Sequence, residues 1–271
     1  MTEGRHESGG VKTITLYPSD LTDDQWKMLE KMLPKPKSRG RPPSPMRRII
    51  NAILYVTRTG CQWRSLPHEY GAWQTVYGWM RRFKTNHIWS MVHDRLRALV
   101  RESVGKRSQP TACILDSQTV RSADHRGEVG YDAAKKTKGR KRHLLVDTLG
   151  LILGVAVTPA NVPEREGAMV LLKRVLGWFI WLRLLWADGG YTGPDFAANV
   201  RQIRPKLRVE VVPRLGQGPG FKVLRRRWVV ERTLGWLMKQ RRLVRDYEQT
   251  ESSAEAFIHI SMIRIMLRRL A

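Results

Sequence analysis

Apolar residues recur at helical spacing through the first part of the chain. Trp73, Val76, Tyr77 and Met80 lie about one turn apart and predict a helix over 73–84. A capping box of Thr22 and Gln25 predicts a helix that begins there. A second helix is predicted with Ser44 as its cap and Pro45 as its first residue, ending at Gly60, and another over 88–104. Residues 17–105 should therefore form a small all-α domain behind a flexible tail, 1–16. A helix-turn-helix and a plain helical bundle fit this pattern equally well.

The pattern changes after residue 110, where short apolar runs typical of strands begin. Thr111–Leu115 and Leu182–Ala187 are predicted strands, and two β-rich runs over 143–147 and 151–158 are joined by a tight turn. Another strand is predicted over 209–212, and helices over 165–176, 222–241 and 253–270. Strands and helices in this order predict an α/β fold with a mixed sheet over 111–271.

Two of the predicted strands run directly into a carboxylate. Asp116 follows Ala112-Cys113-Ile114-Leu115, and Asp188 follows Leu184-Leu185-Trp186-Ala187. A buried charge is costly unless it is paired or binds a metal ion. Ligand sites of open α/β sheets lie at the carboxyl ends of strands, and carboxylate oxygens suit Mg²⁺. Asp116 and Asp188 are therefore predicted to share a metal site.

The helix predicted over 222–241 offers a third carboxylate, Glu231. Arg227 precedes it by four residues, so both side chains lie on one helix face. An acid beside a cation suits a metal ion and the phosphate that the ion activates. A simple surface ion pair between Arg227 and Glu231 fits the same spacing.

Charge favours a nucleic acid as partner, although a ribosome-associated protein or a generally basic proteome fits the same excess. Forty-nine Lys and Arg residues face 24 Asp and Glu, which gives a net charge of +25. A nucleic acid would share such a surface, because basic side chains displace the counterions of its phosphates. The two cysteines make neither a disulfide framework nor a zinc site. The most apolar run, over 176–182, is shorter than the roughly 20 residues of a membrane span. We expect a cytoplasmic, nucleoid-associated protein without a membrane partner.

Four motifs, in this order, resemble those of the bacterial insertion-sequence DDE transposases, in the group named after insertion sequence five. They are Ile114-Leu115-Asp116-Ser117-Gln118-Thr119-Val120, Gly139-Arg140-Lys141-Arg142-His143-Leu144-Leu145-Val146-Asp147, Trp186-Ala187-Asp188-Gly189-Gly190-Tyr191 and Arg227-Trp228-Val229-Val230-Glu231-Arg232-Thr233. The N-terminal part, notably Gly71-Ala72-Trp73-Gln74-Thr75-Val76-Tyr77, also looks like the helical domain of this group. The resemblance covers about residues 20–248.

The resemblance implies a ribonuclease H-like catalytic domain in which Asp116, Asp188 and Glu231 are the catalytic, metal-binding triad. It further implies two Mg²⁺ ions, with Mn²⁺ as a substitute, and DNA cleavage and strand transfer by in-line displacement. Arg227 and Glu231 match the third motif of the family. Leu224 and Met238 stand where that motif has Tyr and Lys, and Lys239 lies one place later.

Basic residues near these motifs are predicted to contact double-stranded DNA. Residues 135–142 hold six basic residues in eight and precede the predicted hairpin. The full predicted set is Arg81, Arg82, Lys84, Lys135, Lys136, Lys138, Arg140, Lys141, Arg142 and Arg227. Tyr191 is either a substrate contact or a packed turn residue. The partners expected are transposon ends and target DNA, with at least a dimer assembled on the DNA.

Two other classes of DNA-rearranging enzyme are excluded by missing motifs. None of the seven histidines has Arg three places on, as a tyrosine recombinase requires, and no two histidines flank a single apolar residue, as a rolling-circle nuclease requires. Two alternatives stay open. One is a transposase-derived helix-turn-helix regulator, which would bind DNA without cutting it, and the other is a ribonuclease H-like nuclease, which would not join ends to target DNA.

Overall fold

The computed structural model describes residues 17–34, 45–123, 127–212 and 227–271. Its N-terminal part is helical, as predicted, and the sequence forms these elements through clear local signals. The Thr22 side chain and Gln25 close the predicted capping box. Gly60 ends the second helix in the left-handed conformation, φ 71°. The elements are α1 (Asp23–Glu30), α2 (Met46–Thr59), the 3₁₀ turns η1 (Trp63–Ser65) and η2 (His68–Tyr70), α3 (Trp73–Thr85) and α4 (Ile88–Ser103).

A mixed six-stranded sheet follows. Its main path runs β2-β3-β1-β5-β6, and β4 pairs with β3. Strand β3 pairs antiparallel with β1, β2 and β4. Strand β5 pairs parallel with β1 and with β6. The strands are β1 (Ala112–Arg121), β2 (Gly130–Asp132), β3 (Thr137–Asp147), β4 (Ile152–Pro159), β5 (Leu184–Ala187) and β6 (Arg208–Val211). This is the ribonuclease H-like α/β arrangement predicted from the sequence.

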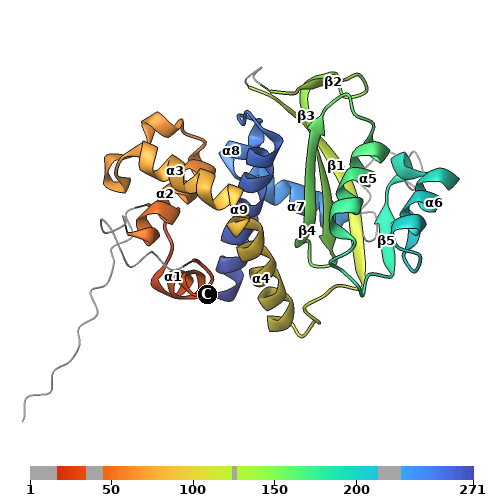
Figure 1. Cartoon of the computed structure of the whole chain (residues 1–271), viewed down its shortest axis with the longest axis horizontal. Coiled ribbons are helices and arrows are strands. Elements are labelled where there is room, and N and C mark those ends of the chain that lie inside the picture. The colour runs from red at the N-terminus through yellow and green to blue at the C-terminus, as the bar shows by residue number, and fades with distance from the viewer. Residues whose placement is uncertain (1–16, 35–44, 124–126, 213–226) are drawn as a thin grey trace, which may run out of the picture.

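Helices cover both faces of the sheet (Figure 1). Helices α5 (Glu164–Val175) and α6 (Pro194–Ile203) pack on one face, and helices α7 (Trp228–Met238) and α9 (Glu251–Leu270) pack on the other. Two elements are short, η3 (Gly189–Tyr191) and α8 (Arg241–Val244). Alternation along β1 separates the two cores: Cys113 and Leu115 pack with α5, and Ile114 packs with α7 and α9. The core between the sheet and helices α7 and α9 continues without interruption into α1–α4, so the two predicted domains share this core.

Several element boundaries differ from the prediction. Pro45 is itself the N-cap of α2, so the helix begins one residue later, and the predicted cap Ser44 lies outside the described residues. The predicted helix over 222–241 is described from Trp228 and ends at Met238, because Gln240 adopts an extended conformation, φ −95° and ψ 111°. Leu224 and the first residues of that prediction are also outside the described part. Helix α6 and strand β2 were not predicted.

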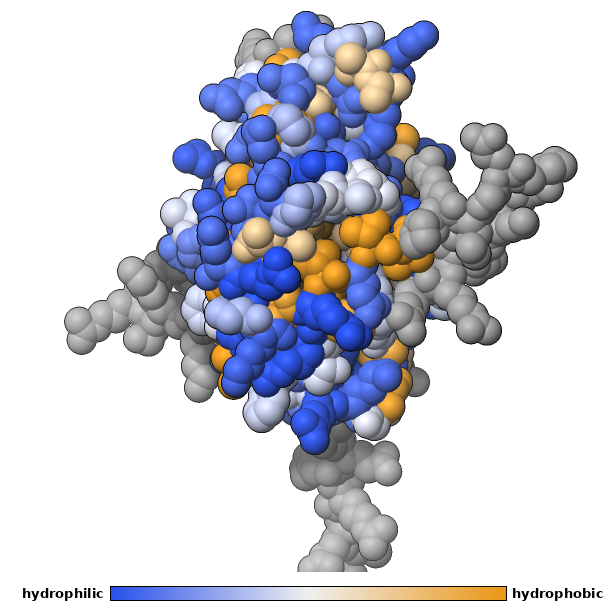
Figure 2. Space-filling model, turned by 90° about the vertical axis from the view of Figure 1, so that its right-hand side faces the viewer, coloured by the Kyte–Doolittle hydropathy of each residue, from blue (hydrophilic) through white to orange (hydrophobic). Residues whose placement is uncertain are grey.

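The α5–α6 side of the molecule is mostly hydrophilic, with an apolar area near its middle (Figure 2). Three large apolar side chains that follow α5 are strongly exposed: Trp178 at 77%, Ile180 at 52% and Trp181 at 48%. None of the described helices is long and apolar enough to cross a membrane.

Candidate active site

Asp116 and Asp188 lie opposite each other, where β1 and β5 separate. The parallel register ends at the pair Ile114 and Trp186, and each aspartate comes two residues after its member of that pair. Asp188 directly follows β5, as predicted. The predicted end of the first strand at Asp116 is wrong: β1 continues to Arg121 because β3 pairs with it along its other edge over its whole outer half.

Backbone amides hold both carboxylates in place. The Ser117 N–H donates to Asp116 Oδ1 over 2.8 Å, and the Gly190 N–H donates to Asp188 Oδ1 over 2.9 Å. Asp188 thereby caps the short 3₁₀ turn η3. Each aspartate is therefore held by a nearby backbone amide, and the strand register brings the two together.

Arg227 joins the third acid to this pair. Its Nη2 atom lies 3.8 Å from Asp116 Oδ2, 3.6 Å from Asp188 Oδ2 and 3.7 Å from Glu231 Oε1. The Arg227 side chain is 6% exposed, and Glu231, in the first turn of α7, is 42% exposed. The structure therefore brings the three predicted acids around one buried guanidinium.

Burial makes Asp116 a weaker acid than an ordinary aspartate. Desolvation raises its pKa to about 6, and the negative charges of Asp188 and Glu164 act in the same direction. The Ser117 N–H and the Arg227 guanidinium lower it. Asp116 is still mostly ionised at pH 7 to 8, which is the form that a metal ion requires.

A fourth acid, Glu164, was missed by the sequence analysis. It begins α5, and its Oε1 atom accepts hydrogen bonds from Ser117 Oγ at 2.9 Å and from Lys135 Nζ at 3.1 Å. Burial raises the Glu164 pKa, and the contacts with Lys135 and Ser117 outweigh it, so the net shift is downward. An acid after a proline at a helix start is ordinarily a partner of the helix dipole, so the sequence alone contained no signal for this position.

Asp116, Asp188 and Glu164 share an open cleft of about 900 Å³, here called the acid cleft. It is lined by Asp116, Ser117, Lys135, Glu164, Asp188, Gly189, Gly190, Thr192, Val211 and Arg227. A Cβ atom at Gly190 would lie 3.0 Å from Asp188 Oδ1 and 3.1 Å from Glu164 Oε2, so only glycine leaves the space between these carboxylates open.

The donor set fits a hard divalent cation, since all its ligands are carboxylate oxygens. Within the described residues, no three His, Cys, Asp or Glu side chains are grouped closely enough to hold an ion together. Arg227 lies among the acids at ion-pair distance from three of them. Metal binding therefore requires the acids to close up around the ion and the guanidinium to move aside.

Comparison with known proteins agrees with this geometry. Residues 107–267 match the family model "Transposase DDE domain", which is more than half of the chain, and residues 21–93 match "Putative transposase of IS4/5 family". The chain belongs to the DDE transposases of the IS4/IS5 group.

Two curated proteins are similar to this transposase. The "Insertion element IS402 uncharacterized 16.2 kDa protein" of Burkholderia cepacia is 31% identical over 109 residues, which cover 38% of this chain and 73% of that protein. "Uncharacterized protein y4sN" of Sinorhizobium fredii is 28% identical over 120 residues, covering 44% of this chain and 86% of that protein.

The basic run over 135–142 divides into two groups in the structure of the transposase. Lys135, Lys136 and Lys138 are exposed at the start of β3. Arg140, Lys141 and Arg142 are buried, with 1%, 5% and 1% of their surface exposed, because they lie inside β3 with strands on both edges.

The buried group makes internal contacts, which corrects its predicted role in contacting DNA. Arg140 forms an ion pair with Asp246 and donates to the carbonyls of residues 128, 248 and 249. Arg142 donates to the Leu243 carbonyl, and Lys141 to the Val162 carbonyl. These side chains hold β3 to neighbouring segments and have no surface left for a phosphate.

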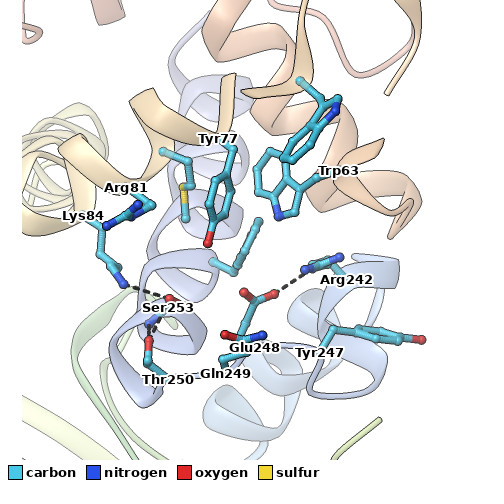
Figure 3. Close-up of a pocket in the computed structure, with 13 residues that line it drawn as sticks. Trp63, Tyr77, Arg81, Lys84, Arg242, Tyr247, Glu248, Gln249, Thr250 and Ser253 are labelled. Atoms are coloured by element: carbon cyan, nitrogen blue, oxygen red, sulfur yellow. Dashed lines mark hydrogen bonds and ion pairs between the residues drawn. The ribbon is translucent and has the colours of Figure 1, made fainter. Parts of the chain in front are cut away.

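Arg81 and Lys84 lie at a different place, in a pocket of about 420 Å³ between α3 and the start of α9 (Figure 3). The pocket is lined by Trp63, Trp73, Tyr77, Met80, Arg81, Lys84, Arg242, Tyr247, Glu248, Gln249, Thr250, Ser253 and Phe257, and is here called the aromatic pocket. Lys84 Nζ donates to Ser253 Oγ over 2.9 Å. Arg82 is exposed beside it and its guanidinium stacks 4.4 Å from the Trp79 ring.

Proposed function

We propose that this transposase binds the terminal inverted repeats of its transposon and cleaves and joins DNA through Asp116, Asp188 and Glu231. The observation that carries the proposal is the position of the Arg227 guanidinium, within 3.8 Å of all three acids. Three carboxylates around one cation form the charge pattern that a divalent metal ion requires. The acids come from β1, from the end of β5 and from α7, three elements that meet only in the folded chain.

The metal ions of this proposal are two Mg²⁺ ions, for which Mn²⁺ can substitute. Bound in the acid cleft, they would supply Lewis-acid stabilisation of the phosphoryl oxygens. Asp116, Asp188 and Glu231 would hold them. The backbone donors of Ser117 and Gly190 orient the two aspartates, and a ligand held in this way loses little freedom on binding.

Arg227 is proposed to bind the phosphate beside the metal site. Its Nε atom is buried and has no hydrogen-bond partner among the described residues, and its contacts with the acids are ion pairs longer than hydrogen bonds. The guanidinium therefore keeps donors for a phosphate oxygen, which arginine binds with fixed geometry. Metal ions that neutralise the acids would free its charge for this contact.

The remaining DNA contacts are proposed at two surfaces. Lys135 lines the acid cleft and is followed by the exposed Lys136 and Lys138. Arg81 and Lys84 line the aromatic pocket, and the neighbouring Arg82 is exposed. Both surfaces would follow the phosphate backbone and would make binding depend on salt. Pairing of two transposon ends would require at least two copies of the chain.

A cleavage assay on DNA that carries the inverted repeats tests the proposal. The wild-type protein should bind this DNA and cut it when Mg²⁺ is present, whereas Asp116→Asn should bind equally well and not cut. Asp24→Asn, a change at an exposed carboxylate of α1, is the control and should cut normally. Equal cutting by Asp116→Asn and wild type would contradict the assignment of the triad. A wild-type protein that binds and never cuts would be a DNA-binding regulator.

A further inference from the structure

Glu164 lies beside the proposed metal ligands without belonging to the DDE triad. Alternation along β1 places Asp116 on the face that meets α7, and Ser117 on the face that meets α5. Glu164, at the start of α5, contacts Ser117 and lines the acid cleft together with both aspartates. The acid cleft therefore receives carboxylates from both sides of the sheet.

The gap at Gly190 shows that the Asp188 and Glu164 carboxylates face the same small space. The point where a Cβ atom would stand is 3.0 Å from Asp188 Oδ1 and 3.1 Å from Glu164 Oε2. A Cβ atom at this position would be in tight contact with both oxygens. Modest side-chain movement brings oxygens so placed to the distances of about 2 Å at which Mg²⁺ is bound.

Tyr191 gives an independent indication that a ligand belongs here. Its side chain is 1% exposed, and its hydroxyl has no hydrogen-bond partner among the described residues. Burial raises the Tyr191 pKa most, the negative charges of Glu164 and Asp116 raise it further, and the nearby Ser117 hydroxyl lowers it, so the Tyr191 hydroxyl lies close to these acids. A buried hydroxyl without a well-formed hydrogen bond is costly, and a bound ion with its water molecules would supply a partner.

Carboxylates outnumber cations among the side chains that line the acid cleft. Asp116, Asp188 and Glu164 are opposed by Arg227 and Lys135. One negative charge is left over, in a chain whose net charge is +25. This local excess of negative charge is the opposite of what DNA binding alone would favour.

We propose that Glu164 is a fourth metal ligand of the acid cleft, binding a divalent cation together with Asp116 and Asp188. Lys135, 3.1 Å from Glu164 Oε1, neutralises the carboxylate while no ion is bound. The proposal rests on the proposed function, since it adds a ligand to the same metal site.

Binding of Mn²⁺ to the full-length protein, followed by electron paramagnetic resonance without DNA, tests this role directly. Glu164→Gln keeps an oxygen that can accept from Ser117 and removes the charge, so the fold should persist. We expect this variant to bind Mn²⁺ about 10-fold to 100-fold more weakly, or to bind one ion fewer. Glu166→Gln is the matched control, because Glu166 is exposed on the same helix turn. It should bind Mn²⁺ like wild type.

A second variant acts in the opposite direction. Lys135→Met removes the counter-ion of Glu164, so Mn²⁺ affinity should rise several-fold, and this gain should disappear when Glu164→Gln is present as well. Affinities of Glu164→Gln and wild type that agree within twofold, including no binding in either, would overturn the proposal. The triad would survive that result if Asp116→Asn still abolished DNA cleavage, so failure of the two proposals can be told apart.

Discussion

Replacing Asp116 with asparagine is expected to make the metal-free transposase more stable at pH 8. Burial raises the pKa of this carboxyl from 3.8 to about 6, although Ser117 and Arg227 favour its ionised form. One pKa unit corresponds to about 1.36 kcal/mol, so ionised Asp116 destabilises the fold by roughly 3 kcal/mol. Asparagine has nearly the same shape and no charge, and the variant should recover most of this free energy.

The sign follows from the direction of the shift. A group whose pKa is higher in the folded state stabilises the fold below its unfolded pKa of 3.8, and this contribution is lost as pH rises through about 6. The stability difference between Asp116→Asn and wild type should therefore be small at pH 4 and reach roughly 3 kcal/mol at pH 8. In a chain of this size, that difference raises the melting temperature by roughly 6 °C.

The assay is urea unfolding in the presence of EDTA at pH 4, 6 and 8, with Asp24→Asn as control. The control should differ from wild type by no more than about 0.5 kcal/mol at each pH, because its carboxylate is exposed. Excess Mg²⁺ should stabilise wild type and have little effect on Asp116→Asn. If Asp116→Asn gains no stability at pH 8, or gains equally at pH 4 and pH 8, the buried charge of Asp116 does not destabilise the fold.

Four further substitutions, one of them a control, separate packing from DNA contact. Gly167→Ala would place a Cβ atom 2.0 Å from His143 Nε2, where α5 crosses β3, and should lower the free energy of unfolding in urea by about 1–3 kcal/mol. The control Gly78→Ala, on the open side of α3, should instead raise this free energy by about 0.5–1 kcal/mol. Equal stabilities of the two variants would show that α5 can shift. Lys138→Ala should reduce the slope of log affinity for DNA against log salt by about 0.9 and leave the melting temperature unchanged. Arg140→Ala should lower stability by about 3–5 kcal/mol because it breaks a buried ion pair; loss of DNA affinity at unchanged stability would contradict its internal role.

Local signals along the chain predicted many of the elements correctly. The capping box of Thr22 and Gln25 forms, and the tight turn after Asp147 joins two antiparallel strands. Helix α6 was missed although Pro194 opens it and Phe196 and Val200 lie one turn apart on its buried face. The signal was present there but short, and a ten-residue helix between two strands is easily taken for a loop.

The basic run at 135–142 shows where sequence reasoning stops. The residues alone show a dense positive charge, and Lys138 and Arg140 look equivalent. In the fold, Lys138 is exposed, whereas Arg140 is 1% exposed. From Arg140 onward, β3 is paired with β1 on one edge and with β4 on the other. Whether a cation meets solvent or a buried carboxylate depends on strand pairing, which the local sequence does not contain.

The sequence by itself determined the class of protein and its α/β fold, and it predicted the three acids, because motifs, caps and apolar periodicity depend on neighbouring residues. Only the tertiary structure decided how those acids meet. The parallel register of β1 and β5 aligns Asp116 with Asp188, and α7 brings Arg227 among them. Glu164 enters from the other face of the sheet. Charges far apart along the chain interact only after packing has excluded water between them, and the sequence order does not show which of them will meet.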